Sequence, residues 1–192
     1  IAGVFEVTAY PDAADIGKYL VESRPQIFFG VPRVWEKLQA GVMAAARANP
    51  EQLAMLEAAL PIGERVSEYR ARGEDLPAGL AAELTGAQPV FDFVLNLLGL
   101  DQVISAISGA APISMDTLKF FRCLGLEMSE VYGLSETSGP MTWEPFRVHL
   151  GTVGLPIPGC EVTLADDGEV MSRGGNIFRG YLNDPERTGE VL

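Results

Sequence analysis

Hydrophobic residues in the first part of the chain alternate between short strand-like runs and helical spacing. Residues 3–9 and 26–30 are short apolar runs of the kind that form strands. Between them, residues 11–22 place apolar side chains on one helical face, which predicts a helix. A further helix is predicted from Pro32, since proline suits a first helical position, to the Asn49-Pro50 pair.

A charged, alanine-rich stretch follows, and we expect a helical insertion over about residues 50–89. Leucines at helical spacing indicate a helix within residues 51–75. We expect it to be broken or kinked at Pro61, because proline removes a helical hydrogen bond. Residues 74–89 contain two prolines and two glycines and are predicted to be looser, whereas residues 90–98 return to helical spacing.

The middle of the chain predicts a strand, a helix and a second strand in succession. Residues 102–108 and 126–132 have the apolar character of buried strands. Between them, Ser114 has the side chain of a helix N-cap for residues 115–124. This order is typical of a parallel sheet with crossover helices, so the predicted fold class is α/β.

Glycine and proline become frequent after Gly139. Residues 161–164 and 169–172 flank the turn sequence Asp166-Asp167-Gly168, which predicts a β-hairpin. We therefore divide the chain into an α/β unit, residues 1–146, and the start of a small β-rich subdomain, residues 147–192.

Charge and composition narrow the function. The formal net charge is −12 among 192 residues, and acidic residues are dispersed, which argues against a nucleic-acid partner. ATP remains compatible, because a local pocket and a metal ion can hold it. No apolar run reaches the length of about 18 residues that spans a bilayer, and the two cysteines lack metal or redox spacing. These features favour a cytoplasmic protein and leave peripheral membrane association open.

Two segments rich in small and polar residues follow predicted strands. The first runs from Ser108 to Pro112, and the second from Tyr132 to Gly139. Ligands bind at the carboxyl ends of strands in open α/β sheets, so both segments belong to the predicted binding edge. Small side chains let a flat ring approach the backbone, and Glu136 offers a hard oxygen ligand for Mg²⁺. Tight turns with helix-capping side chains are the alternative explanation.

Five segments of the chain match a known family in order. They are IFFGVPRVWEKL, SGAAPIS, VYGLSETSGP, GTVGLPIPGCEV and DDGEVMSRGGNIFRGYLNDPERT. Together they resemble the adenylate-forming (AMP-binding) superfamily, and most closely the bubblegum-type and actinobacterial branch of its long-chain acyl-CoA synthetases. The resemblance implies part of a large N-terminal adenylation domain. It also implies a two-step reaction, in which a fatty acid and ATP with Mg²⁺ give acyl-AMP, and coenzyme A then displaces AMP.

The resemblance also implies roles for individual residues. Glu136 would ligate Mg²⁺, and Ser135 would hydrogen-bond the α-phosphate. Tyr132 would stack on adenine. The residues implied in nucleotide binding are Gly109, Ala110, Ala111, Pro112, Glu130, Val131, Tyr132, Gly133 and Ser135.

The family's phosphate-binding loop is expected upstream of Ile1, and its C-terminal domain with the catalytic lysine beyond Leu192. Both would be partners within one polypeptide, so we expect the 192-residue chain alone to be inactive. Three alternatives stay open: a fatty acyl-AMP ligase that loads a carrier protein, a nucleotide-binding domain without catalysis, and a dinucleotide-dependent oxidoreductase. The last lacks a G-x-G-x-x-G sequence at a strand-to-helix turn.

Overall fold

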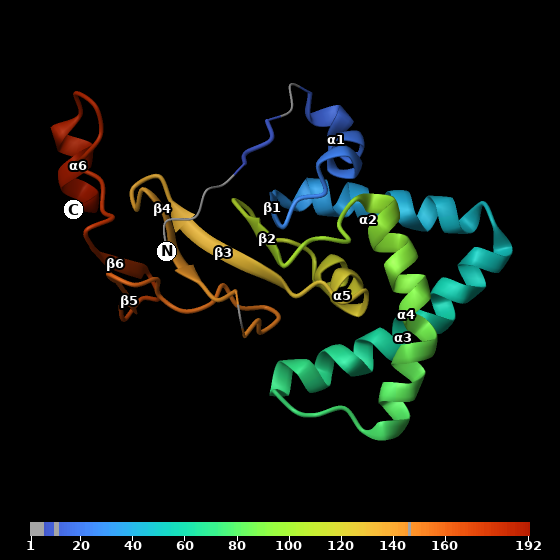
Figure 1. Cartoon of the computed structure of the whole chain (residues 1–192). Coiled ribbons are helices and arrows are strands. Elements are labelled where there is room, and N and C mark those ends of the chain that lie inside the picture. Colours follow the sequence, from blue (N-terminus) through green and yellow to red (C-terminus); the bar gives the residue numbers. More distant parts are fainter. Residues whose placement is uncertain (1–5, 10–11, 146) are drawn as a thin grey trace.

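The fold is a helical layer packed on one end of a mostly parallel sheet, with a separate small hairpin at the other end (Figure 1). The computed structural model describes residues 6–9, 12–145 and 147–192. The helices are a 3-10 helix at Ala13–Asp15, α1 (Ile16–Ser23), α2 (Pro32–Arg47), α3 (Pro50–Arg72), α4 (Ala78–Leu98), α5 (Met115–Cys123) and α6 (Pro185–Val191). The strands are β1 (Ile27–Gly30), β2 (Ser105–Gly109), β3 (Met128–Leu134), β4 (Gly139–Trp143), β5 (Cys160–Leu164) and β6 (Val170–Gly174).

The sheet confirms the α/β class with one difference. Strands β1, β2 and β3 are parallel and connected by crossover helices, as predicted, and they are neighbours in that order. Strand β4 adds to the edge at β3 but runs antiparallel. The reason is a tight turn at residues 135–138, because so short a connection can only return the chain beside itself.

Capping residues and glycine mark the ends of several helices. Ser114 caps α5 by accepting a hydrogen bond from the Thr117 N–H at 3.1 Å. Asn49 caps α3 in the same way, accepting from the N–H groups of Glu51 and Gln52. Gly73 ends α3 with a φ of 67°, in the left-handed region that glycine adopts readily.

One expectation for the helical region is wrong and another is corrected in part. Helix α4 already begins at Ala78, so residues 78–89 are helical and not loose. Helix α3 continues through Pro61 without a break, and a kink there stays a prediction. Leu80 and Phe91 are both buried on α4, which packs along α3. This burial compensates for the helical hydrogen bond that Pro89 cannot donate.

The first predicted strand is not confirmed either. Residues 6–9 have no regular structure, and residues 3–5 lie outside the described residues. The division at residue 146 stays a prediction. In the sequence, the strands β1–β4 of one sheet precede residue 146, and the strands β5 and β6 of the other follow it.

The core lies between the sheet and the helices, and Trp35 of α2 is at its centre. Its side chain is fully buried and packs edge-to-face on Phe28 and Phe121, with ring centroids 4.9 and 5.0 Å away. Its indole N–H donates to the carbonyls of Gly30 and Ile107. These contacts fix α2 and α5 against β1 and β2, the strands that lead to the predicted binding edge.

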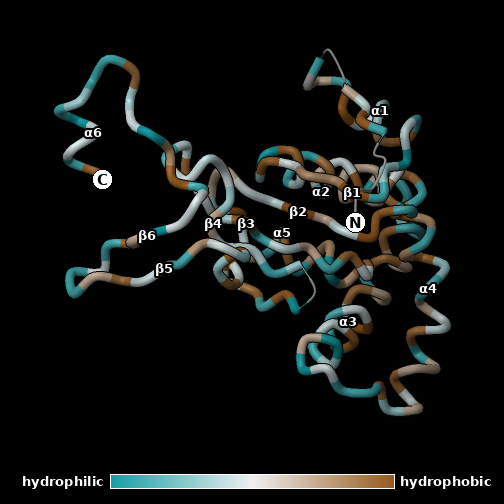
Figure 2. Tube along the Cα trace, turned by 60° about the vertical axis from the view of Figure 1, so that its left-hand side comes forward, coloured by the Kyte–Doolittle hydropathy of each residue, from teal (hydrophilic) through white to brown (hydrophobic). Residues whose placement is uncertain are grey.

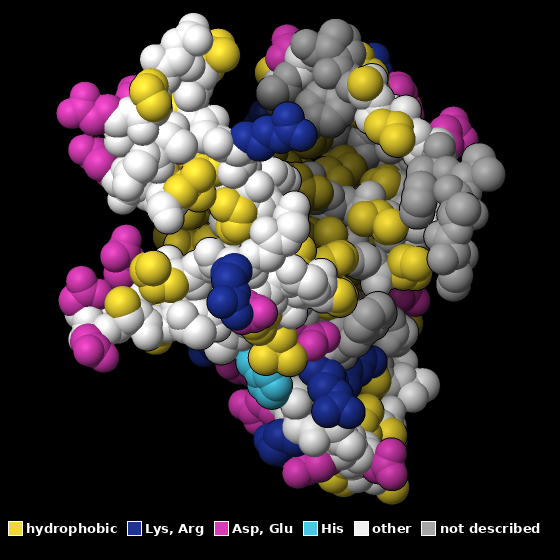
Figure 3. All heavy atoms as spheres, turned by 90° about the vertical axis from the view of Figure 1, so that its left-hand side faces the viewer, with side chains coloured by type: hydrophobic (Ala, Val, Ile, Leu, Met, Phe, Trp, Pro, Cys, Tyr) yellow, Lys and Arg dark blue, Asp and Glu magenta, His cyan; other side chains and the backbone are white. Residues whose placement is uncertain are grey.

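The hydrophobic segments gather around β1, β2, α4 and α5, whereas α6 and the β5–β6 hairpin are more polar (Figure 2). Figure 3 views the molecule from the side that is on the left in Figure 1. Hydrophobic side chains gather near the middle of this face, and most acidic side chains lie along the outline of the molecule. Among the described residues, no helix is both long and apolar enough to cross a bilayer.

Candidate functional site

The two segments predicted to bind the ligand, residues 108–112 and 132–139, begin beside each other because β2 and β3 pair in parallel. Gly109 pairs with Val131, and Ser108 pairs with Glu130. The second segment then diverges, because β3 continues to Leu134 before the chain turns. At the rise of a strand, about 3.3 Å per residue, the end of β3 at Leu134 lies about 10 Å further along than Val131. The site is therefore elongated along β3.

Gly109 is required by the packing of the sheet itself. A β-carbon there would lie 2.5 Å from the Cγ1 atom of Val131, so a side chain at this position would displace the neighbouring strand. Ala110 follows with a φ of 72°, which is uncommon for a residue other than glycine. Ala110, Ala111 and Pro112 are all exposed. The fold thus presents a small, conformationally strained loop at the end of β2, as a flat ligand would need.

Glu130 lies half-buried beneath this loop. Its carboxylate accepts a hydrogen bond from the backbone N–H of Ile113, which favours the charged form. Burial acts in the opposite direction and dominates, so the pKa of Glu130 is raised above its usual value. Glu130 therefore connects β3 with the segment that leads from the loop to α5.

Tyr132 lies in β3, as the strand predicted over residues 126–132 implies, but β3 also includes Gly133 and Leu134, which the sequence placed in the loop. Tyr132 is half-buried and pairs with Thr142, and a bulge shifts the register between Tyr132 and Gly133. A β-carbon at Gly133 would lie 2.0 Å from the carbonyl oxygen of Gly139. Gly133 thus permits the close return of β4.

A single buried hydroxyl closes the turn that joins β3 to β4. The Thr137 Oγ1 atom accepts from the Leu134 N–H at 2.9 Å and lies 2.6 Å from the Gly139 carbonyl oxygen, to which it donates. Ser135 is exposed, and its carbonyl accepts from the Ser138 N–H at 3.1 Å. The turn therefore presents Ser135 and Glu136 from a rigid base. We call residues 135–138 the signature turn.

Glu136 is the half-buried acidic side chain of this turn. Its Oε1 atom accepts a hydrogen bond from the Tyr181 hydroxyl at 2.5 Å, and its carbonyl accepts from the Phe178 N–H at 2.8 Å. The Tyr181 hydrogen bond is the main reason that the pKa of Glu136 is lowered. A hydrogen bond from the Glu136 backbone N–H and, more weakly, the charge of Arg187 act in the same direction. Glu136 is therefore ionised at neutral pH.

The donor chemistry of Glu136 fits Mg²⁺. Within the described ranges, no group of three or more His, Cys, Asp or Glu side chains could hold a metal ion. A cage of protein ligands is not what Mg²⁺ needs beside a nucleotide, since one or two carboxylates and the substrate phosphates suffice. One ionised carboxylate at the end of an extended strand meets that requirement.

Sequence reasoning missed Tyr181, Phe178 and Asn176. Asn176 lies in the turn after β6, and its amide donates to the Thr137 carbonyl at 3.2 Å. Nothing near these residues in the sequence indicates a contact with the signature turn, because about 40 residues separate the partners. A small cavity of about 150 Å³ between α3, α4 and α5 is lined by none of the predicted site residues.

The fold and this site define an adenylate-forming enzyme domain. The chain matches the family described as AMP-binding enzyme over residues 2–182, and it belongs to that family.

Curated relatives agree. The provisional fatty-acid–CoA ligase fadD11 of Mycobacterium tuberculosis is 38% identical over 97% of this chain. The long-chain-fatty-acid–CoA ligase ACSBG2 of Xenopus laevis is 35% identical over 96% of it. The chain spans 34% and 26% of the length of these two relatives.

Solved structures support the fold. The adenylation domain of a carboxylate reductase from Mycobacterium chelonae matches with a TM-score of 0.56 and 19% identity, over 96% of this chain and 26% of that one. The anthranilate CoA ligase AuaEII matches with a TM-score of 0.54 and 13% identity, over 94% of this chain and 28% of that one.

Proposed function

We propose that this chain forms part of a fatty-acid–CoA ligase, which activates a long-chain fatty acid with ATP and Mg²⁺ to acyl-AMP and then transfers the acyl group to coenzyme A. The observation that carries the proposal is the ionised carboxylate of Glu136 on a rigid turn, in a chain of the AMP-binding family. Two curated relatives, ACSBG2 of Xenopus laevis and FadD15 of Mycobacterium bovis, are named as long-chain-fatty-acid–CoA ligases, which supports the substrate class.

The described residues would act chiefly by positioning and by charge. Mg²⁺ would neutralise phosphate charge in the first step, and Glu136 is the residue that would hold it. Ser135 is exposed beside Glu136 and would donate a hydrogen bond to the α-phosphate. The strained loop at Ala110 and Ala111 would lie against the adenine ring, with Tyr132 as the aromatic face.

The second candidate is a fatty acyl-AMP ligase that passes the acyl group to a carrier protein. It shares the first step and differs only in the acceptor. A non-catalytic nucleotide-binding domain is disfavoured, because a scaffold has no need of an ionised carboxylate on the signature turn. Release of acyl-CoA by the full-length gene product separates the first two candidates.

The test compares the full-length gene product with its Glu136→Gln variant on fatty acids of graded length. We expect pyrophosphate release with long-chain acids, and a loss on the order of 100-fold or more in the variant, because charge stabilisation is removed. The matched control is Glu57→Gln, an exposed glutamate on α3, which should keep full activity. Wild-type activity in a folded Glu136→Gln variant would refute the assigned role.

The 192-residue chain expressed alone should give no acyl-AMP, because the family's phosphate loop and catalytic lysine are not among its residues. Clear formation of acyl-AMP by that chain would contradict this part of the proposal.

A further inference from the structure

The segment that follows β6 is hydrogen-bonded to the signature turn. Three hydrogen bonds join them. Asn176 donates to the Thr137 carbonyl, the Phe178 N–H donates to the Glu136 carbonyl, and the Tyr181 hydroxyl donates to the Glu136 carboxylate. We call residues 176–181 the clamp segment. It contacts both the backbone of the turn and the side chain that the turn presents.

Tyr181 is itself firmly placed. Its ring packs edge-to-face on Phe178, with centroids 5.0 Å apart, and the Arg187 guanidinium lies 4.7 Å from its centroid. Its backbone N–H donates to the Thr188 hydroxyl at 2.9 Å. Thr188 fits there because Gly180 has no side chain, since a β-carbon at Gly180 would lie 2.7 Å from the Thr188 methyl group.

This arrangement decides how the Glu136 carboxylate is presented. A glutamate side chain that is free in solution loses substantial conformational entropy when it binds a cation. The Tyr181 hydroxyl already holds the Oε1 atom at 2.5 Å, so much of that entropy is lost on folding. The carboxylate also accepts a hydrogen bond from the Glu136 backbone N–H. Its two oxygens offer about four lone-pair sites, so these two hydrogen bonds still leave sites for a cation.

We propose that Tyr181 is a positioning residue, which holds one oxygen of the Glu136 carboxylate so that the other receives Mg²⁺ together with the nucleotide phosphates. Arg187 and Phe178 serve this role by fixing the Tyr181 ring. The inference rests on the proposed function of Glu136 and adds a residue that lies 45 positions further along the chain. The clamp segment would then connect the β5–β6 hairpin to the proposed metal site.

The experiment uses the full-length gene product and its Tyr181→Phe variant, which loses one oxygen atom and keeps the ring. The first measurement is Mn²⁺ binding by electron paramagnetic resonance, in the presence of the non-hydrolysable α,β-methylene ATP. The second is the dependence of pyrophosphate release on Mg²⁺. We expect roughly tenfold weaker Mn²⁺ binding and a matching rise in the half-saturating Mg²⁺ concentration, from the loss of a hydrogen bond to a charged group. The kcat at saturating Mg²⁺ should stay within about twofold, because the variant lowers metal affinity and leaves the chemistry intact.

Tyr69→Phe is the matched control, since Tyr69 lies on α3 beside Arg72 and away from the turn. It should leave both measurements unchanged. Wild-type Mn²⁺ affinity in Tyr181→Phe overturns the inference, and so does a fall in kcat with unchanged Mg²⁺ dependence. If Tyr181→Phe does not fold, Thr188→Val tests the inference instead. This substitution removes the hydrogen bond from the Tyr181 backbone N–H and leaves the Tyr181 hydroxyl in place. Weaker Mn²⁺ binding there supports the inference, and unchanged binding overturns it.

Glu136→Gln separates this inference from the function on which it rests. If Glu136→Gln loses Mn²⁺ binding while Tyr181→Phe keeps it, the proposed function survives and only the role of Tyr181 fails. If Glu136→Gln also keeps Mn²⁺ binding, the metal site itself is wrong.

Discussion

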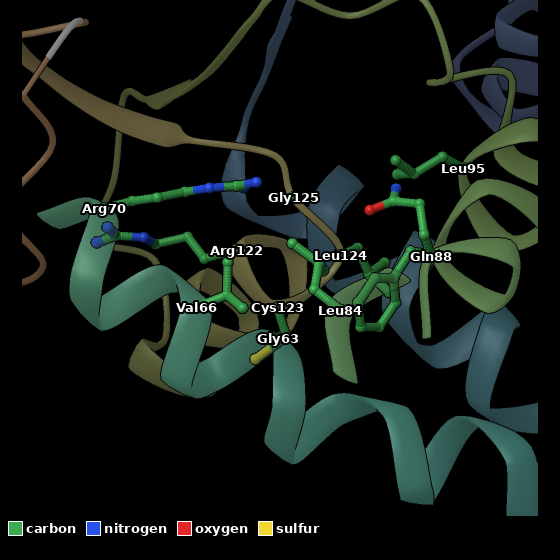
Figure 4. Close-up of a pocket in the computed structure, with 11 residues that line it drawn as sticks. Gly63, Val66, Arg70, Leu84, Gln88, Leu95, Arg122, Cys123, Leu124 and Gly125 are labelled. Atoms are coloured by element: carbon green, nitrogen blue, oxygen red, sulfur yellow. The ribbon is translucent and has the colours of Figure 1, made fainter. Parts of the chain in front are cut away.

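Gly63 on α3 lies directly against the backbone of Cys123 on α5. A β-carbon at Gly63 would be 2.1 Å from the Cys123 carbonyl oxygen and 2.7 Å from its carbonyl carbon. Figure 4 shows both residues at the wall of the small cavity, over which the Arg70 side chain extends toward Gly125. The absence of a side chain at Gly63 therefore sets how closely α3 approaches α5.

We predict that Gly63→Ala lowers the free energy of unfolding by about 1–3 kcal/mol, because the added methyl group pushes the two helices apart. Gly86→Ala on α4 is the matched control, since a β-carbon there meets nothing within 4 Å. It should raise the free energy of unfolding by about 0.5–1 kcal/mol through helix propensity. Urea denaturation of both variants tests this. Equal effects of the two substitutions would show that the α3–α5 contact is not tight.

Thr137 gives a second prediction, about the signature turn. Thr137→Val keeps the shape of the side chain but leaves the Leu134 N–H and the Gly139 carbonyl without their hydroxyl partner. We expect a loss of about 1–3 kcal/mol in the free energy of unfolding, because Thr137 is only 4% exposed. Thr137→Ser keeps the hydroxyl and should cost less. If serine proves as harmful as valine, the methyl group and not the hydroxyl maintains the turn.

Cys123 gives a third prediction, on pH. Burial raises the pKa of the Cys123 thiol from its ordinary 9.0 to about 11, and the negative charge of Glu64 adds to the effect. The folded protein should therefore react with iodoacetamide at pH 8 at least roughly 100-fold more slowly at Cys123 than the urea-unfolded chain, because the thiolate is the reactive form. Mass spectrometry of the labelled peptide measures this.

The raised pKa of Cys123 also predicts how the free energy of unfolding changes with pH. As pH rises from about 9 to about 11, the unfolded thiol ionises while the folded thiol stays protonated. The unfolded state then binds fewer protons than the folded state, so the free energy of unfolding falls. Cys123→Ala should remove this part of the alkaline decline. Parallel curves for wild type and Cys123→Ala would contradict the shifted pKa.

The sequence predicted those parts of the fold whose signals act over a few residues. Ser114 is the N-cap of α5 and α2 ends before the Asn49-Pro50 pair, both as expected, and the Asp166-Asp167-Gly168 turn joins β5 to β6. The helical extent of residues 78–89 was missed, because burial of Leu80 and Ala87 outweighs the local preference of proline and glycine.

For the candidate site, the motif residues could be chosen from the sequence, but not their surroundings. Their assignment as nucleotide and metal ligands stays a prediction. Gly109 and Gly133 were selected as ligand-facing positions, and the structure gives both a packing reason, in Val131 and in Gly139. The motif thus serves the sheet as well as the proposed ligand.

The sequence by itself determined the α/β class, the family and Glu136 as the candidate ligand, because strand periodicity, caps and a short motif are properties of neighbouring residues. Only the tertiary structure decided that β4 returns antiparallel beside β3 and that Tyr181 holds Glu136. The physical reason is the same in both cases. A hydrogen bond or a strand pairing forms between groups that the path of the chain brings within about 3 Å, and for Glu136 and Tyr181 that path takes in β4, β5 and β6.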